Sequence, residues 1–330
     1  MGLASRLSLA LGAGDVRLPE AARIAVFGPR AGDDLSALPA GLCHVITGFR
    51  PDRDHFAALG HECARAPEGR YGAAVVCLAR ARALSEAMIA RAAAVTDGPV
   101  IVDGAKTDGI EAVLRACRAR AEIGVVLSKA HGKLFSFPAG PGFEDWARGA
   151  PRPVAGGLVT VPGIFSADGI DPGSALLADC LPETLGARVA DLGAGWGYLA
   201  HRALARESIE ELHLVEADHD ALDCARRNLC DPRVRFHWED ATRWQPDTAL
   251  DTVICNPPFH SGRSPDPGLG QAFIRAAAGM LSPRGQLFLV ANRHLPYEAA
   301  LEQYFGVAGE IGGDGRFKLL HAARPRRRAA

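Results

Sequence analysis

The sequence predicts an α/β protein of two domains, each built around a mostly parallel sheet. Short runs rich in β-branched residues alternate with helical stretches along the whole chain, a pattern typical of parallel sheets covered by helices. The 330 residues suffice for two domains of ordinary size, and 48% of them are hydrophobic. A stretch rich in Pro and Gly, residues 148–157, interrupts this pattern. We interpret it as the linker between domain 1–150 and domain 151–330.

Composition limits the class of protein. The formal net charge is −1, so a nucleic-acid partner would have to bind a local basic patch. No stretch approaches the roughly 20 apolar residues that span a bilayer, and the first residues hold too short an apolar run for a signal peptide. None of the eight cysteines forms a C-x-x-C pair, so we expect reduced thiols, a cytoplasmic location and no metal site.

An internal repeat relates the two predicted domains. Five short segments of the first domain match five segments of the second in the same order, and their separation grows gradually, as longer loops in the second copy would require. The matched pairs are residues 23–28 with 188–193, 44–47 with 213–216, 75–78 with 253–256, 98–102 with 285–289, and 122–124 with 310–312. The alternative is that any two α/β domains share such a rhythm.

A predicted buried strand in the second domain runs through Asp191 into a glycine-rich turn. The turn has the spacing D-x-G-x-G-x-G, with the glycines Gly193, Gly195 and Gly197. Glycine lets a backbone turn sharply and approach a ligand closely. A dinucleotide-binding turn has the spacing G-x-G-x-x-G, and Tyr198 stands where its third glycine would be. A different nucleoside site and a tight turn without a ligand remain as alternatives.

Acidic residues follow the next two predicted strands. Glu216 ends the first of them, where a carboxylate can accept hydrogen bonds from ribose hydroxyls. Asp240 follows the second and can accept from an adenine amino group, while the amide of Ala241 can donate to the ring. Glu239 could take the place of Asp240. The structural alternative is that these acids are solvated carboxylates at strand ends.

The tetrapeptide Asn256-Pro257-Pro258-Phe259 directly follows the fourth predicted strand of this domain. The two prolines fix φ twice and hold the preceding Asn extended, so the loop is stiff. The Asn256 side-chain oxygen and the Pro257 carbonyl can accept both hydrogens of a planar amino group, which directs its lone pair toward a methyl carbon. Phe259 can stack on a flat substrate. The alternative is a Pro-rich turn without a chemical role.

These residues resemble the class I S-adenosylmethionine-dependent methyltransferases, and the Asn-Pro-Pro-Phe motif resembles enzymes that methylate planar amino nitrogens. Further segments resemble the small-subunit ribosomal RNA guanine-N2 methyltransferase family, which carries the methyltransferase small domain. These segments are residues 162–166, 168–171, 173–174, 256–260, 290–292, 295–297 and 315–318. The resemblance is specific over about residues 158–322 and is only architectural before residue 150.

The resemblance implies two tandem Rossmann-like class I methyltransferase domains, each a mostly parallel seven-stranded sheet. It implies a degenerate first domain (1–150) that serves as scaffold and RNA dock, and a catalytic second domain (151–330) with S-adenosylmethionine as cofactor. The cofactor-binding residues that it implies are Asp191, Gly193, Gly195, Glu216, Asp240, Ala241 and, near the methionine end, Phe165. The catalytic residues that it implies are Asn256, Pro257 and Phe259.

The repeat predicts that the first domain has lost its cofactor site. Val26, Arg30, Thr47 and Leu78 stand at the positions that correspond to the ligand-binding residues of the second domain, and only Gly28 persists. We therefore expect that the first domain binds no S-adenosylmethionine.

Basic residues are candidate contacts for RNA phosphates. Arg316 and Lys318 flank Phe317 in a strand-like segment, which predicts both cations on one face. Arg263 lies in the polar, Pro-containing stretch after the tetrapeptide and is a further candidate. Two other basic segments are equally well explained as solvated loop or tail: Lys129 with His131 and Lys133, and residues 324–328.

The expected function is transfer of a methyl group from S-adenosylmethionine to the exocyclic N2 of a guanine in ribosomal RNA, with the small subunit favoured. Alternatives with the same chemistry are adenine N6, a guanine N2 of large-subunit rRNA, and protein glutamine. An alternative of another class is a non-catalytic RNA-binding assembly factor. The expected partner is ribosomal RNA or the small ribosomal subunit, with no membrane, and the sequence leaves the modified nucleotide and the oligomeric state open.

Overall fold

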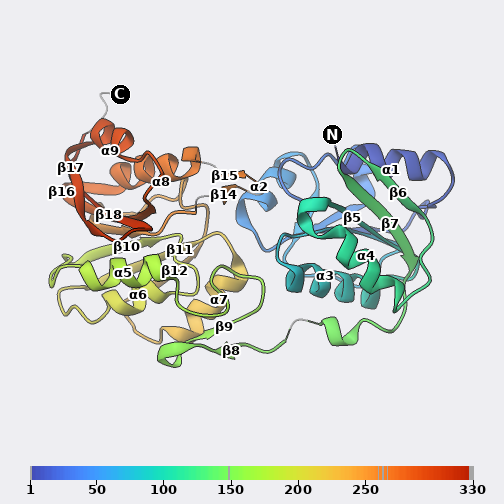
Figure 1. The fold of residues 1–330 in the computed structure, drawn as a ribbon, viewed down its shortest axis with the longest axis horizontal. Helices are drawn as coiled ribbons and strands as arrows, with labels where there is room; N and C mark the ends of the chain where they lie inside the picture. Colours follow the sequence, from blue (N-terminus) through green and yellow to red (C-terminus); the bar gives the residue numbers. More distant parts are fainter. Residues whose placement is uncertain (1, 148, 259, 262–263, 266, 327–330) are drawn as a thin grey trace. The chain divides into compact units, whose positions relative to one another are not determined.

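The computed structural model divides into two compact units, Met1–Ala150 and Pro151–Ala330. Residues 1, 148, 259, 262–263, 266 and 327–330 lie outside the described part of the structure, as do the side chains of residues 259–267. Each unit is an α/β fold with helices packed on a central sheet (Figure 1). Across the described residues, no helix is long and apolar enough to cross a membrane.

The first unit contains a seven-stranded sheet. Its strands are β1 (Ile24–Phe27), β2 (Cys43–Ile46), β3 (Glu62–Ala64), β4 (Ala73–Cys77), β5 (Pro99–Ala105), β6 (Val126–Lys129) and β7 (Gly132–Pro138). Its helices are α1 (Leu3–Gly12), α2 (Arg50–Ala58), α3 (Arg82–Val95) and α4 (Ile110–Arg118), with short 3-10 turns η1 (Ala40–Leu42), η2 (Lys106–Asp108) and η3 (Glu144–Trp146). The strand order is β3-β2-β1-β4-β5-β7-β6, and β7 runs antiparallel to its neighbours.

The second unit contains a sheet of the same size. Its strands are β10 (Arg188–Leu192), β11 (Glu211–Glu216), β12 (Val234–Trp238), β13 (Leu250–Cys255), β16 (Leu281–Asn292), β17 (Phe305–Gly313) and β18 (Phe317–Pro325). Its helices are α5 (Pro172–Cys180), α6 (Tyr198–Ala203), α7 (His219–Asn228), α8 (Pro267–Met280) and α9 (Glu298–Tyr304), with the 3-10 turn η4 (Ala155–Gly157). Two short pairs are β8 (Arg152–Pro153) with β9 (Val159–Thr160), and β14 (His260–Ser261) with β15 (Ser264–Pro265). The strand order is β12-β11-β10-β13-β16-β18-β17, and β18 is antiparallel to its neighbours.

The central strands β1 and β10 are mostly apolar because helices cover both of their faces, and β10 also carries the buried Asp191. In β10, Val189 packs in the cluster that contains residues of α5 and α6, whereas Ala190 and Leu192 pack in the cluster of α8 and α9. In β1, Ile24 and Val26 pack with α1, and the alternate residues pack with α3 and α4. Successive side chains of a strand point to opposite faces, so each sheet has a helical layer on either side.

The identical strand order confirms the prediction of two tandem, mostly parallel, seven-stranded domains. The register corrects one match within the repeat. The last residue pair between β1 and β4 is followed on β4 by Cys77, and the last pair between β10 and β13 is followed by Asn256. Cys77 is therefore the counterpart of Asn256, and the expected match with Leu78 is wrong by one residue. Two short apolar runs can be aligned in either register from sequence, and only strand pairing decides between them.

Two further expectations about the chain's organisation change. Residues 122–124 precede β6, whereas their expected counterparts, residues 310–312, lie within β17, so that match is displaced. The expected linker, residues 148–157, is partly structured, because β8 pairs with β9 through Arg152 and Thr160. The boundary between the compact units falls within it, between Ala150 and Pro151.

Candidate active site

The glycine turn follows β10 and is shaped by backbone conformations that favour glycine. Gly193, Gly195 and Gly197 have φ of 71°, 56° and 89°. Such left-handed values are strained for residues with a Cβ. The Gly193 amide donates to the Val215 carbonyl at 2.9 Å, which ties the turn to the end of β11. An ideal Cβ on Gly195 would meet no heavy atom within 4 Å, so the space beside this residue is open to a ligand.

Glu216 stands at the end of β11, beside that turn. Its two carboxylate oxygens accept the backbone N–H groups of Gly195 and Asp218, each at 2.7 Å. Burial raises the pKa of Glu216 to about 7, although these backbone hydrogen bonds oppose the rise. The carboxylate is therefore fixed in place and takes up a proton more readily than an exposed glutamate.

Asp191 lies beneath the turn and is fully buried. Its Oδ2 accepts the backbone N–H of Ala200 in α6 at 3.1 Å, and its Oδ1 has no hydrogen-bond partner among the described residues. Burial raises the pKa of Asp191 to about 8. The carboxyl group thus joins the end of β10 to the helix that follows the turn.

The end of β12 lies next to Glu216. The backbone N–H of Glu239 donates to the Glu216 carbonyl at 3.1 Å. Asp240 Oδ1 accepts from the backbone N–H of Thr242 at 2.8 Å and from its hydroxyl at 2.7 Å. Ala241 is buried. These contacts fix the backbone at Asp240 and Ala241. The assignment of Asp240, with Glu239 as the alternative, as the residue that binds adenine stays a prediction.

Asn256 follows β13, the strand next to β10. Its Nδ2 donates to Asp171 Oδ2 at 3.0 Å and to Ser174 Oγ at 2.8 Å. Asp171 and Ser174 lie at the start of α5. Nothing near them in the sequence indicates a role, because their contact with Asn256 spans more than 80 residues of chain. Pro257 is buried, and Phe259 lies outside the described residues.

One cleft brings the glycine turn and Asn256 together. Its lining residues come from the turn, the start of α6, the start of α5 and the loop before it: Phe165, Ser166, Asp171, Ser174, Gly193, Ala194, Gly195, Trp196, Tyr198, Leu199 and Asn256. Phe165 stands at its edge with 56% of its surface exposed. A ligand on the turn would therefore lie beside the carboxamide of Asn256, which is the arrangement that group transfer requires.

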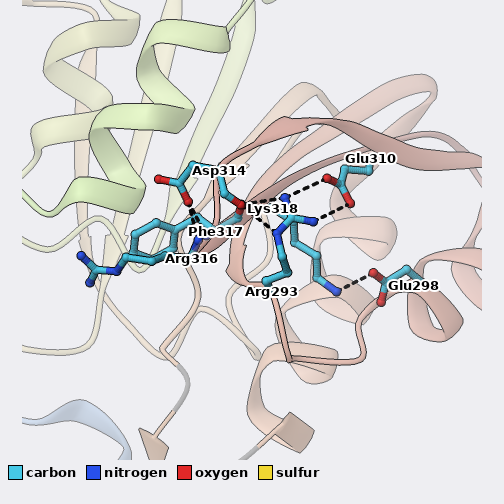
Figure 2. Close-up of polar contacts among 7 residues, drawn as sticks. All are labelled: Arg293, Glu298, Glu310, Asp314, Arg316, Phe317 and Lys318. Carbon is cyan, nitrogen blue, oxygen red and sulfur yellow. Dashed lines mark hydrogen bonds and ion pairs between the residues drawn. The ribbon is translucent and has the colours of Figure 1, made fainter.

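The expectation that Arg316 and Lys318 share one exposed face is wrong. Lys318 is buried, and its Nζ pairs with Glu298. Arg316 precedes β18 in the turn, and its guanidinium lies 5.2 Å from the centre of the Phe317 ring. Figure 2 shows Lys318 directed toward Glu298 and Arg316 extending away from it beyond the ring. Arg316 and Lys318 do not alternate along one strand, because β18 begins after Arg316.

The other basic candidates fall into two groups, those outside the described residues and those that line a cavity of the first unit. Arg263 and the end of the basic tail, residues 327–328, lie outside the described residues. Lys129, His131 and Lys133 line a cavity of about 290 Å³ together with Lys106, Glu111 and two small residues. Lys133 Nζ pairs with Glu111 at 3.1 Å, so part of this positive charge is already neutralised.

One group of side chains among the described residues has the geometry to hold a metal ion: His44, Glu62 and Glu68 in the first unit. Arg23 already pairs with Glu62 at 2.9 Å and donates to the Glu68 carbonyl at 3.4 Å. The guanidinium thus supplies a cation there. The prediction that the protein uses no metal remains a prediction.

The fold and the cleft define a class of protein. A seven-stranded sheet with one antiparallel strand next to its edge, a glycine turn after its central strand and an acid after the neighbouring strand are the features of class I S-adenosylmethionine-dependent methyltransferases. The open space beside Gly195 and the fixed carboxylate of Glu216 fit the nucleoside part of that cofactor.

Comparison with known proteins gives the family. Residues 156–321 match the methyltransferase small domain family. The ribosomal RNA small subunit methyltransferase C of Pseudomonas aeruginosa (strain UCBPP-PA14) is 31% identical over 288 residues, 83% of this chain and 84% of that protein. The chain therefore belongs to the methyltransferase small domain family, and the expected enzyme class and cofactor, a methyltransferase that uses S-adenosylmethionine, are confirmed.

Other relatives align over less of their length. The small subunit methyltransferase C of Hahella chejuensis is 36% identical over 51% of this chain and 49% of its own length. The ribosomal RNA large subunit methyltransferase G of Shewanella amazonensis is 32% identical over 69% of this chain and 62% of its own length. The chain thus matches about half to two thirds of these two proteins.

A solved structure covers both units. It is the 16S rRNA N2 G1207 methyltransferase of T. thermophilus in complex with AdoMet and guanosine. Its sequence is 26% identical to this chain. The alignment spans 97% of this chain and 91% of the chain in that structure, with a TM-score of 0.80. The likeness extends through the first unit, where the sequence analysis found only architectural resemblance.

Proposed function

We propose that this protein transfers a methyl group from S-adenosylmethionine to the exocyclic N2 amino group of a guanine in small-subunit ribosomal RNA. The observation that carries the proposal is the shared cleft, in which the carboxamide of Asn256 adjoins the glycine turn. The likeness to the T. thermophilus enzyme supports guanine as the target, because that structure holds guanosine together with the cofactor.

In this proposal the cofactor lies along the carboxyl ends of β10, β11 and β12. The backbone of Gly193 and Gly195 lies against it, and Glu216 accepts hydrogen bonds from its ribose hydroxyls. The Asp240 carboxylate and the Ala241 amide contact the adenine, and Phe165 covers the methionine end. Asp191, which is fully buried, supports the cofactor site by holding the turn against α6.

The bound cofactor supplies an activated methyl group, and the protein's own residues orient the acceptor. The Asn256 side-chain oxygen and the Pro257 carbonyl accept the two hydrogens of the guanine amino group. This draws the nitrogen from planar toward pyramidal geometry and aligns its lone pair for in-line attack. A strong general base is unnecessary, because the methylated nitrogen is acidic and loses its proton readily.

The target base must leave its stack to reach a cleft at the strand ends. Stacking of the base on Phe259 would offset part of that cost, since a base–aromatic stack is worth roughly 1–3 kcal/mol. Arg263 and Arg316 are proposed contacts for the RNA backbone, whereas Lys318 is not, because it is buried in its pair with Glu298. The first domain (1–150) is proposed as a scaffold and RNA dock, and the protein as cytoplasmic.

The test uses S-adenosylmethionine with a deuterated methyl group and ribosomal RNA transcribed in vitro. Small-subunit and large-subunit RNA are incubated separately with the purified protein, digested to nucleosides and measured by mass spectrometry. Label in N2-methylguanosine from small-subunit RNA is the expected result. Label only in large-subunit RNA would favour a second candidate function, methylation of a guanine N2 in large-subunit RNA. The similarity to the large subunit methyltransferase G supports that candidate. Label in N6-methyladenosine, or no label in either RNA or in the assembled small subunit, would refute the proposal.

The variant Asn256→Ala tests the catalytic assignment. Losing an oriented hydrogen-bonding group at the reacting centre typically costs about 10²-fold or more in kcat. We expect that loss together with nearly unchanged affinity for S-adenosylmethionine. Retained turnover would contradict the assigned role of Asn256.

A further inference from the structure

The carboxamide of Asn256 is held by two side chains at the start of α5. Its Nδ2 donates to Asp171 Oδ2 at 3.0 Å and to Ser174 Oγ at 2.8 Å. An amide nitrogen has two hydrogens, and these contacts use both. All three residues line the cleft that also contains the glycine turn.

Asp171 determines which end of the amide faces α5. An ionised carboxylate only accepts hydrogen bonds, so it can face the nitrogen of Asn256 but not its oxygen. Turning the amide over would bring two acceptor oxygens together. The hydroxyl of Ser174 can donate or accept, and would tolerate either orientation by itself. The carboxylate therefore sets the direction, and the hydroxyl adds a second point of attachment.

The start of α5 holds Asp171 firmly. Asp171 is the N-cap of this helix, and its Oδ2 accepts the Ser174 backbone N–H at 2.7 Å. Pro172 takes the first helical position, where its fixed φ suits a helix start. At the next position, a Cβ on Gly173 would lie 3.1 Å from Phe317 Cε1, so glycine allows the helix start to pack closely against this ring. The acceptor that faces Asn256 thus stands on a well-packed helix end.

We infer that Asp171 and Ser174 are positioning residues, which turn the Asn256 oxygen toward the nitrogen that receives the methyl group. The inference rests on the proposed function, in which that oxygen accepts a hydrogen of the target amino group. With the amide nitrogen engaged by α5, the site presents an acceptor to the substrate. It therefore favours substrates that offer an N–H at this point over those that offer a carbonyl oxygen.

Three variants separate this role from helix capping. Asp171→Ser and Asp171→Asn both keep a good N-cap residue. Only the asparagine carries an oxygen at the distance of Oδ2, where it can still face the amide of Asn256. Ser174→Ala removes the hydroxyl contact and leaves the capped backbone N–H in place. The readouts are kcat and KM with ribosomal RNA, the Kd of S-adenosylmethionine and the melting temperature, all with the full-length protein.

We expect Asp171→Ser to lower kcat by about 10²-fold, as a misoriented reacting group does. Asp171→Asn should recover much of this loss, and Ser174→Ala should show a smaller one. The Kd of S-adenosylmethionine should stay within about twofold of the wild-type value. Two results would overturn the inference: a kcat for Asp171→Ser equal to that of the wild type, or losses of cofactor affinity and melting temperature that parallel the loss of turnover.

A second measurement does not depend on the substrate. The side-chain NH2 signals of Asn256 can be assigned in ¹⁵N-labelled protein by their absence in Asn256→Ala. We expect slow hydrogen exchange at both hydrogens in the wild type and faster exchange in Asp171→Ser. If the wild type yields no methylated nucleoside, the proposed function fails, and the exchange rates still decide whether Asp171 holds the amide. Equal exchange rates in wild type and variant would refute that.

Discussion

Glu216 Oε2 accepts the backbone N–H of Gly195 at 2.7 Å, so the carboxylate at the end of β11 and the glycine turn after β10 form one hydrogen-bonded unit. The other oxygen of Glu216 accepts from Asp218 at the start of α7. A carboxylate held from both sides is already in place before a ligand binds. Such preorganisation reduces the entropic cost of binding.

The first prediction concerns the pH dependence of cofactor affinity. The pKa of Glu216 is raised to about 7 by burial, so below that pH the free protein holds this group protonated. Ribose hydroxyls donate to the ionised form, and binding is therefore coupled to loss of the proton. The affinity for S-adenosylmethionine should rise with pH through about 7 and level off above it. Between pH 6 and pH 8 the expected change is roughly tenfold.

The control is Glu216→Gln, measured by calorimetry over the same pH range. This variant should bind weakly at every pH and lack the rise assigned to Glu216. The amino group of the cofactor titrates equally with both proteins, so the difference between the two profiles isolates the carboxylate. Parallel profiles would contradict the prediction.

The second prediction concerns the stoichiometry of the cofactor. The first domain has Val26 and Thr47 at the positions of Asp191 and Glu216, and Cys77 at that of Asn256. It therefore lacks the carboxylate that would hold a ribose. Titration of the full-length protein should give one S-adenosylmethionine per chain, and Glu216→Ala should remove the measurable site. Two sites, or a second site that survives in Glu216→Ala, would show that the first domain binds the cofactor.

The third prediction concerns a buried ion pair in the first unit. Arg6 Nε and Nη2 donate to the two oxygens of Asp103 at 2.6 and 2.7 Å, and both residues are buried. The Arg6→Met variant leaves the Asp103 charge buried without the guanidinium of Arg6. We expect a loss of about 3–5 kcal/mol in the free energy of unfolding, measured by urea titration.

Two further variants serve as controls for the buried pair. In Arg6→Met with Asp103→Leu, neither charge of the pair is present, and the loss should be clearly smaller. Arg82→Met removes an exposed pair with Glu86 in the same unit and should change stability by about 0.5 kcal/mol or less. Equal losses of stability in Arg6→Met and Arg82→Met would contradict the prediction, because they would mean that losing the partner costs no more at a buried pair than at an exposed one.

Much of the fold follows from local sequence patterns. A strand such as β1 is a continuous apolar run because both faces of a parallel sheet are covered, and such a run is visible in sequence. The glycine turn was also predictable, because positive φ values favour glycine and the sequence has glycine at all three positions that adopt them. The pairing register was not, and the match of Asn256 with Leu78 instead of Cys77 shows why. Register depends on how strands meet in space, which neighbouring residues in the chain do not encode.

Side-chain partners were the least predictable part of the site. Asp171 and Asn256 are 85 residues apart in the chain, and nothing near either residue indicates the other. A lysine is usually exposed, yet Lys318 is buried and its Nζ pairs with Glu298. Lys318 was noted from sequence as a cation, whereas Asp171 was noted only as part of a resembling segment, and the environment of each is set by tertiary packing.

Arg316, in the turn between β17 and β18, and Lys318, within β18, differ in exposure, and RNA binding should depend on the first alone. Arg316 is exposed and stacks on Phe317, so its charge is available to an RNA phosphate. Arg316→Ala should weaken RNA binding and lower the slope of log affinity against log salt by about 1, as loss of one phosphate contact does. Lys318→Met should leave RNA affinity and its salt slope unchanged, and it should lower the melting temperature because Glu298 loses its partner. Filter binding at several salt concentrations measures the first effect and thermal unfolding the second. A salt slope that falls with Lys318→Met and not with Arg316→Ala would restore Lys318 as an RNA contact and contradict the role assigned to Arg316.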